Sequence, residues 1–501
     1  MPLSNKTVVD MIITADAVVT MDEKDRILRP GAVAIRDDRI VGVGTPNAIK
    51  EEFESSKVLG GRHTLVMPGL VDAYAHAGHG MIKGIYTAEL GWPASKVYFH
   101  GSTPEWWEAD ALLTGLDRLR FGVTTGHSTL GATPARADDA AYSEAHVRGV
   151  SQVGTRDILG IGPGDPFLMR SDKSSTATDW RGDTPKEVRF TYDDCMHVSA
   201  EVVSRFDGAS DGRVTVCLAI PYLCGMNPKY TTGSHSYSYS QDEMREMARR
   251  GVEAQEFAAR YGVLIHTHAA RGSFEMVESR LGALQVDAML QENVLIAHGH
   301  GLTAFDMDVL ERNGPSVAWV PFGSWGTRVG PAPVVDLIRR GIRCCIATDG
   351  AAPFHNSDLF LDIHRAMFLI AENYGGDASL LPPGKALRMV TVDAAAALGM
   401  ADDIGSLEVG KKADLIILDT DKPYFIPLEA VPQLLCYFAR GNDVETVIVD
   451  GNILMEDGQV LSVDEHAVKD FAREEAERSF ERVDITPYLA TPESFWRGWR
   501  H

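Results

Sequence analysis

Four short apolar segments of the chain each end in a residue that can bind or work with a metal ion. They read Leu-Val-Asp-Ala-Tyr-Ala-His to His76, Val-Leu-Ile-His-Thr-His to His268, Val-Leu-Ile-Ala-His to His298 and Cys-Cys-Ile-Ala-Thr-Asp to Asp349. One histidine after a strand is usually a satisfied polar group, whereas four such ends are hard to obtain by chance. Imidazoles and a carboxylate suit a divalent ion such as Zn²⁺, Fe²⁺ or Co²⁺. Such an ion can lower the pKa of water from about 15.7 towards about 7.

A scaffold must bring these distant strand ends together. From about residue 66 to 400, helical stretches such as Gln241–Tyr261 and Asp358–Tyr374 alternate with short apolar strands. The strands include Val214–Ile220, Val263–His268, Val294–His298, Val317–Val320 and Cys344–Asp349. This alternation predicts a parallel sheet, and a barrel of roughly 250 residues plus insertions fits the length. The carboxyl ends of the strands then meet at one mouth.

Both ends of the chain look like β structure instead. Short strands rich in branched residues occur at Asp10–Met21, Ala32–Arg36 and Arg39–Gly44. Ala413–Asp419 and Val444–Met455 repeat this pattern near the other end. We therefore expect strands on both sides of the barrel segment.

The composition is that of a soluble globular protein, with 45% hydrophobic and 24% charged residues. A net charge of −22 argues against a nucleic-acid or anionic-membrane partner. The chain shows no signal peptide and no apolar run of the roughly 20 residues that span a bilayer. The six cysteines form no Cys-x-x-Cys pair, which favours a reducing compartment. We expect a cytoplasmic protein with a small-molecule substrate, and a homo-oligomer is the general default.

Two motifs resemble those of a known family. Residues 68–76 resemble the first-strand signature Pro-Gly-x-[Val/Ile]-[Asp/Asn]-x-His-x-His of the amidohydrolase superfamily. Residues 405–415 resemble the C-terminal signature of its aminohydrolase and chlorohydrolase subgroup, which includes cytosine deaminase-like enzymes. The resemblance covers nearly the whole chain and implies an α/β fold, a (β/α)8 TIM-like barrel at 66–401. A small β-sandwich is then formed by both termini, 1–65 and 402–470, and 471–501 is a helical, aromatic tail.

The resemblance also implies roles for the strand-end residues. His76, His268 and Asp349 are metal ligands, and His298 is either a further ligand or the base and polarising group beside the substrate. Binuclear relatives carry a bridging lysine in the fourth strand, which Val214–Ile220 lacks. One divalent ion is therefore expected, with Zn²⁺ ahead of Fe²⁺ or Co²⁺. Asp349 would move the proton of the attacking water while His298 stabilises the developing oxyanion.

Tyr74 departs from the signature, because it stands where the first histidine belongs. Its phenol either coordinates the ion, or donates a hydrogen bond to substrate or water, or fills the space of a lost metal. His79 and His127 lie nearby in the pattern and either contact the substrate, support the ligands or replace the missing ligand.

Arg271 is a second departure, three residues after His268. The deaminases of the subgroup carry a glutamate there, which protonates a heterocycle, and arginine cannot transfer protons. Arg271 forms a surface salt bridge or binds a substrate carbonyl or carboxylate. This predicts cleavage of an acyl C–N bond of amide, urea, carbamate or thiocarbamate type. The run at 77–83 resembles the phenylurea and molinate hydrolases.

The predicted substrate is small and largely apolar, since aromatic residues follow the strands. Trp92 and Phe322, with Arg271 and His127, are the candidate substrate contacts. Two alternatives remain: an aminohydrolase, deaminase or dechlorinase acting on a nitrogen heterocycle, and a metal-free barrel that serves as a scaffold or binding protein.

Overall fold

The computed structural model describes residues 6–87, 90–130, 136–164, 176–225, 227–230, 238–322 and 330–490. Eight strands form one sheet in which every neighbouring pair is parallel. In chain order they are β8 (Leu70–Asp72), β9 (Val123–Thr129), β10 (Arg156–Ile161), β13 (Val214–Ile220), β14 (Ile265–Ala270), β15 (Val294–His300), β16 (Ser316–Trp319) and β17 (Cys344–Ile346).

The last strand returns to the first, so the sheet is nearly closed. Beyond β17, the Thr348 N–H donates to the Asp72 carboxylate at 3.0 Å. The Asp349 N–H donates to the Tyr74 carbonyl, also at 3.0 Å. The predicted (β/α)8 barrel is therefore confirmed.

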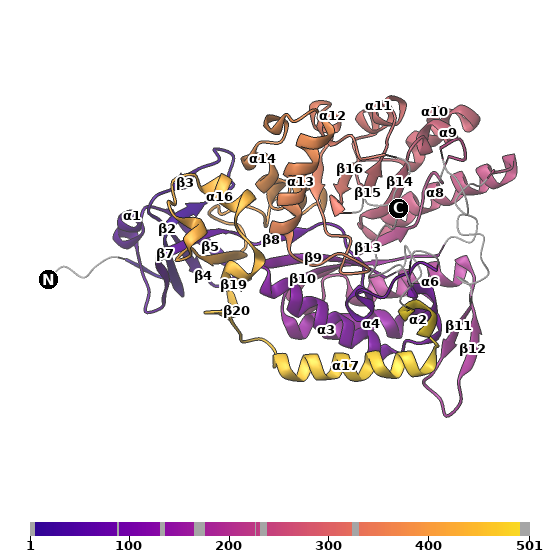
Figure 1. Ribbon diagram of the computed structural model, residues 1–501, viewed down its shortest axis with the longest axis horizontal. Helices are drawn as coiled ribbons and strands as arrows, with labels where there is room; N and C mark the ends of the chain where they lie inside the picture. Colours follow the sequence, from indigo (N-terminus) through magenta and orange to yellow (C-terminus); the bar gives the residue numbers. More distant parts are fainter. Residues whose placement is uncertain are drawn as a thin grey trace, which may run out of the picture.

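Helices surround this sheet (Figure 1). They include α3 (Pro104–Arg120), α4 (Ala140–Val153), α6 (Tyr192–Phe206), α8 (Gln241–Tyr261), α9 (Ser273–Leu281), α10 (Ala283–Met289), α11 (Ala304–Asn313), α12 (Val334–Arg339), α13 (Leu359–Asn373), α14 (Pro383–Arg388) and α15 (Val392–Ala397). The longest, α8, has clear local signals. Ser240 and Glu243 form a capping box at its start, and Gly262 ends it in the left-handed conformation.

Strands from both ends of the chain form a second, mixed sheet beside the barrel (Figure 1). They are β2 (Met11–Val19), β3 (Ile27–Leu28), β4 (Gly31–Arg36), β5 (Arg39–Gly44), β7 (Val58–Pro68), β18 (Leu415–Asp419), β19 (Val444–Val449), β20 (Asn452–Glu456) and β21 (Gln459–Val460). β7 lies between β2 and β18, and Pro68 pairs with Leu415. The predicted boundaries at residues 65, 401 and 470 remain predictions.

The remaining elements complete the described chain. They are β1 (Thr7–Val8), α1 (Pro46–Glu52), β6 (Phe53–Glu54), η1 (His79–Ile82), α2 (Ala94–His100), β11 (Thr176–Asp179), β12 (Lys186–Arg189), α7 (Ala209–Gly212), η5 (Ala378–Leu380), η6 (Pro423–Phe425), α16 (Val431–Tyr437), η7 (Gly441–Asp443), α17 (Glu465–Arg482) and α18 (Thr486–Leu489). α17 lies along α3 (Figure 1). The end of the predicted tail, residues 491–501, lies outside the described residues.

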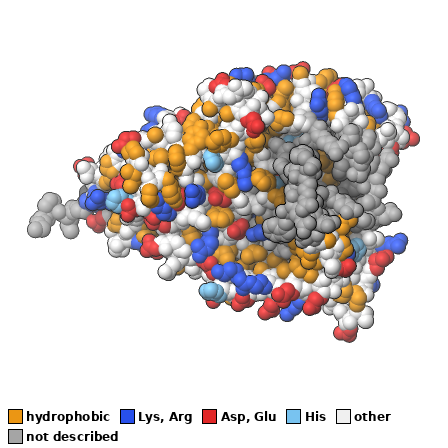
Figure 2. All heavy atoms as spheres, in the orientation of Figure 1, with side chains coloured by type: hydrophobic (Ala, Val, Ile, Leu, Met, Phe, Trp, Pro, Cys, Tyr) orange, Lys and Arg blue, Asp and Glu red, His pale blue; other side chains and the backbone are white. Residues whose placement is uncertain are grey.

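A buried ion-pair network joins the barrel to the terminal sheet. Arg156, the first residue of β10, donates from Nε to Asp414 at 2.6 Å and from Nη2 to Asp450. All three residues are at most 7% exposed. On the molecular surface, by contrast, charged side chains of both signs are interspersed (Figure 2). Within the described ranges, no helix is long and apolar enough to cross a membrane.

Candidate active site

The structure brings the predicted strand-end residues together at the carboxyl edge of the barrel. The Tyr74 Oη lies 2.6 Å from His76 Nε2 and 2.8 Å from His268 Nε2. One Asp349 oxygen lies 3.3 Å from His76 Nε2, and the other lies 3.9 Å from His298 Nε2. These side chains come from the first, fifth, sixth and eighth strands of the sheet. The barrel therefore gathers groups that are far apart in sequence.

Two of these residues have an unusual backbone. His298 has a φ of 63° and Asp349 a φ of 67°, both in the left-handed region that non-glycine residues rarely adopt. Gly350 follows with a φ of 90°, and a Cβ there would lie 2.6 Å from His79 Nδ1. Strained backbone of this kind concentrates at functional sites, so the geometry supports the assignment of this edge as the candidate site.

The electrostatics leave Asp349 charged beside the neutral imidazoles of His268 and His298. Burial favours a higher pKa for Asp349, but His298, His76 and His355 beside it hold that pKa well below its usual value. Burial lowers the pKa of His298 well below its usual value, and that of His268 to about 4. Near neutral pH, Asp349 is therefore ionised while His268 and His298 are neutral.

The hydrogen bonds define the tautomer of His268. Its Nδ1 lies 3.0 Å from the Pro221 carbonyl, which can only accept, so Nδ1 carries the proton. The lone pair of Nε2 then faces the Tyr74 hydroxyl, which donates to it. Burial raises the pKa of Tyr74 well above its usual value, so the isolated phenol keeps its proton. A carbonyl that orients a histidine in this way is typical of metal sites.

Further histidines surround this group, and the sequence interpretation did not include all of them. His266 stacks on the ring of Tyr74, with centroids 4.7 Å apart and planes at 24°. His300 stacks on His298 at 4.9 Å, and His355 Nδ1 donates to the Thr348 carbonyl at 2.9 Å. The sequence carried a signal for two of them. His266 and His300 each lie two residues from a predicted site histidine, on the same face of a strand.

The candidate substrate contacts lie in different places. His127 lies within the barrel, with its ring 6.1 Å from that of Tyr74 and its Nε2 3.4 Å from Cys217 Sγ. Trp92 meets the ring of His79 edge-on at 4.9 Å. The ring of Phe322 meets that of His355 edge-on, also at 4.9 Å. These three residues therefore border the strand-end group.

Arg271 directly follows the last residue of β14. Its side chain is exposed, and its guanidinium lies over the ring of Tyr230, 4.7 Å from the centroid. The partner is thus an aromatic ring, and the predicted contact with a substrate carbonyl or carboxylate stays a prediction.

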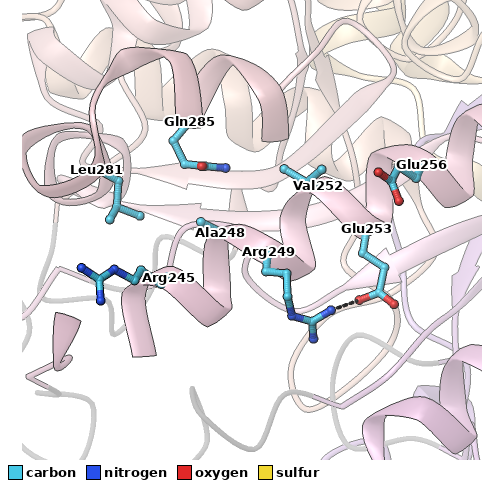
Figure 3. Close-up of a pocket in the computed structure, with 8 residues that line it drawn as sticks. All are labelled: Arg245, Ala248, Arg249, Val252, Glu253, Glu256, Leu281 and Gln285. Carbon is cyan, nitrogen blue, oxygen red and sulfur yellow. Dashed lines mark hydrogen bonds and ion pairs between the residues drawn. The ribbon is translucent and has the colours of Figure 1, made fainter. Parts of the chain in front are cut away.

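A distinct pocket lies on the outer side of the barrel and contains none of these groups (Figure 3). It is lined by residues of α8, α9 and α10, namely Arg245, Ala248, Arg249, Val252, Glu253, Glu256, Leu281 and Gln285. Arg249 and Glu253 form an ion pair there at 3.2 Å. Its charged, open surface does not provide the buried histidines of the strand-end site, so we do not assign the chemistry to it.

A (β/α)8 barrel with histidines and one aspartate at its carboxyl edge defines a class of barrel hydrolases. The chain belongs to the amidohydrolase family, whose sequence pattern matches residues 65–454. This makes it a hydrolase that acts on carbon–nitrogen bonds other than peptide bonds, as predicted. The aminohydrolase subgroup is confirmed as well, whereas the likeness to phenylurea and molinate hydrolases stays a prediction.

Relatives and solved structures agree with this assignment. The chain is 30% identical to a 5-methylthioadenosine/S-adenosylhomocysteine deaminase of Moorella thermoacetica, over 87% of this chain and 92% of the relative. It is also 30% identical to a 5'-deoxyadenosine deaminase of Methanosarcina barkeri, over 95% of this chain and 99% of the relative. An adenosine deaminase of Xanthomonas campestris with bound zinc has the same fold, with a TM-score of 0.77, 21% identity, and 95% and 100% coverage. A zinc-bound atrazine chlorohydrolase of Arthrobacter aurescens follows with a TM-score of 0.70, 19% identity, and 93% and 100% coverage.

The family implies a divalent metal ion, and the types of donor atom at the site fit one. His76 and His268 direct Nε2 atoms towards the Tyr74 oxygen, and Asp349 lies beside them. In the part of the chain that the structure describes, however, histidine, cysteine, aspartate and glutamate alone form no group of three that could hold an ion. Among the described residues, the phenol oxygen of Tyr74 is a third donor that adjoins the imidazoles of both His76 and His268.

Proposed function

We propose that this chain is a metal-dependent aminohydrolase that releases ammonia, or an equivalent leaving group such as chloride, from a ring carbon of a nitrogen heterocycle. The observation that carries this proposal is the 30% identity, over most of both chains, to enzymes named as deaminases of adenine-containing nucleosides. The relatives thus favour the alternative above over the predicted acyl C–N cleavage. The substrate is a small molecule.

The chain's own residues have distinct tasks in this reaction. His76, His268, Tyr74 and Asp349 would hold the ion, which supplies Lewis acidity and makes water a better nucleophile. Asp349, ionised at neutral pH, accepts the proton of the attacking water and passes it to the leaving group. His298 is neutral, and its Nε2 lies 3.9 Å from an Asp349 oxygen. It offers a hydrogen bond to the charge that develops on the substrate.

Acyl C–N hydrolysis is a second candidate, and one specific observation favours it. Arg271 takes the place of the deaminase glutamate and lies exposed over Tyr230. No proton donor for a ring nitrogen is therefore present at that position. Hydrolysis of an amide, urea or carbamate does not need this donor, because the acyl oxygen itself is polarised.

A product assay separates the two candidates. Protein reconstituted with Zn²⁺ is incubated with 5'-deoxyadenosine and 5-methylthioadenosine, with a chlorotriazine, and with phenylureas and carbamates. Ammonia or chloride release supports the first candidate, whereas amine together with acid or CO₂ supports the second. Failure of a metal-loaded protein on all classes contradicts both.

A further inference from the structure

We propose that the phenol oxygen of Tyr74 is itself a ligand of the metal ion. The proposal rests on the proposed function only for the presence of the ion. The Oη lies 2.6 Å from His76 Nε2 and 2.8 Å from His268 Nε2. Ligand atoms about 2.1 Å from one ion, at right angles to each other, are about 3 Å apart. The oxygen lies at hydrogen-bond distance from both nitrogens, a few tenths of an ångström inside that spacing, so an ion bound to both nitrogens must either coordinate the oxygen or displace it.

Displacement is opposed by the packing around Tyr74, whose side chain is fully buried. His266 stacks on one side of its ring at 4.7 Å. Three further imidazoles meet the ring at steep angles, with centroids 5.2, 5.6 and 5.5 Å away: His76, His268 and His298. The phenol can move only if several of these rings move as well. Coordination requires that the oxygen exchange its hydrogen bonds to the two imidazoles for a metal bond and that the phenol release its proton to the solvent, which the positive charge of the ion favours.

The histidine of the second strand, His127, does not replace the missing ligand of the first strand. The Nε2 of His127 lies 3.4 Å from Cys217 Sγ, and its Nδ1 lies 3.2 Å from Thr129 Oγ1. Both of its nitrogens thus have partners away from Tyr74 Oη. The phenol is the donor that completes a group of three with His76 and His268.

The test uses Cu²⁺ as an optical probe, because Zn²⁺ has a filled d shell and no such spectrum. The full-length protein, freed of metal and loaded with one equivalent of Cu²⁺, should show a visible phenolate-to-copper charge-transfer band and resonance-enhanced tyrosine ring modes. Tyr74→Phe should lose both signals and bind Cu²⁺ at least tenfold more weakly. Tyr74→His should bind Cu²⁺ tightly without the band.

Tyr222→Phe is the matched control, because it removes a second, partly buried phenol whose ring lies 5.4 Å from that of His268 but which is not the proposed ligand. It should keep the band. The proposal is overturned if the wild-type protein binds Cu²⁺ in a manner that depends on His268 yet shows no phenolate signal. It is also overturned if binding survives in Tyr74→Phe and is lost in His79→Phe. Product release measured in parallel tests the proposed function separately, since either readout can fail without the other.

Discussion

Asp349 stays ionised inside a buried cluster because histidine side chains lie beside its carboxylate. Burial alone opposes its charge, whereas His298, His76 and His355 favour it and lower its pKa. Burial lowers the pKa of His298 and His268, which therefore do not compete as proton carriers near neutral pH. The site thus contains one ionised carboxylate beside the neutral imidazoles of His268 and His298.

Replacing Asp349 with asparagine keeps the shape but removes this acceptor. We expect Asp349→Asn to reduce kcat by about 10³-fold or more, since proton transfer and ion binding both depend on it. Steady-state product release measures the effect, and circular dichroism verifies the fold. Asp377→Asn, at an exposed turn, should keep full activity. More than a tenth of wild-type activity in Asp349→Asn would place the proton acceptor elsewhere.

His266 should make the protein sensitive to acid. Burial lowers its pKa well below the usual value of about 6.5, and neither ring nitrogen has a partner among the described residues. As pH falls below about 6.5, the unfolded chain binds a proton that the folded chain does not. Stability is therefore lost on acidification, by up to about 1.4 kcal/mol per pH unit until the folded pKa is reached.

His266→Phe removes the group that binds this proton in the unfolded chain, while it retains an aromatic ring against Tyr74. Its Tm should fall less between pH 7 and pH 5 than that of the wild type, as followed by thermal denaturation in matched buffers. If the curves of Tm against pH run parallel for the two proteins, His266 does not titrate as the structure implies.

At the scale of elements, the turn after β17 determines how the eighth strand meets the first. Gly350→Ala should lower activity strongly, because its Cβ would lie 2.6 Å from His79 Nδ1 and 3.1 Å from backbone atoms of His76. Gly376→Ala is the matched control: its φ of 91° nearly equals the 90° of Gly350, but a Cβ there meets nothing within 4 Å. Both variants carry backbone strain, so only the difference in kcat and metal content reports on the site.

The elements that the sequence predicts best are those with strong local signals. The predicted helix at 241–261 coincides with α8, whose capping box is encoded locally, and β13 coincides with the predicted Val214–Ile220. The site was less predictable. The contact between His266 and Tyr74 joins two distant strands, and the outward turn of Arg271 follows from the end of β14 at Ala270. Such details depend on packing between elements, which spacing along one strand does not reveal.

At the scale of the whole molecule, Arg156 holds the barrel and the terminal sheet together through Asp414 and Asp450. Arg156→Met should lower the free energy of unfolding by about 3–5 kcal/mol, because it removes the cation paired with the buried Asp414, whereas Asp450 keeps its ion pair with Lys412. Urea denaturation measures this change. Arg205 forms pairs with Glu144 and Glu201 on the surface, so Arg205→Met should cost below about 1 kcal/mol. Equal effects would contradict the anchoring role of Arg156.

The pairing of β7 with β18 has a consequence for biosynthesis. β7 leaves the ribosome early, yet one of its edges is completed only when Leu415 and its neighbours arrive to pair with residues 64–68. At typical elongation rates this delay is roughly 20–70 s. During that time the nascent chain exposes an open strand edge rich in apolar residues, which invites pairing with other chains. Chaperone demand during translation, rather than the stability of the finished protein, is then expected to limit its yield in a foreign host.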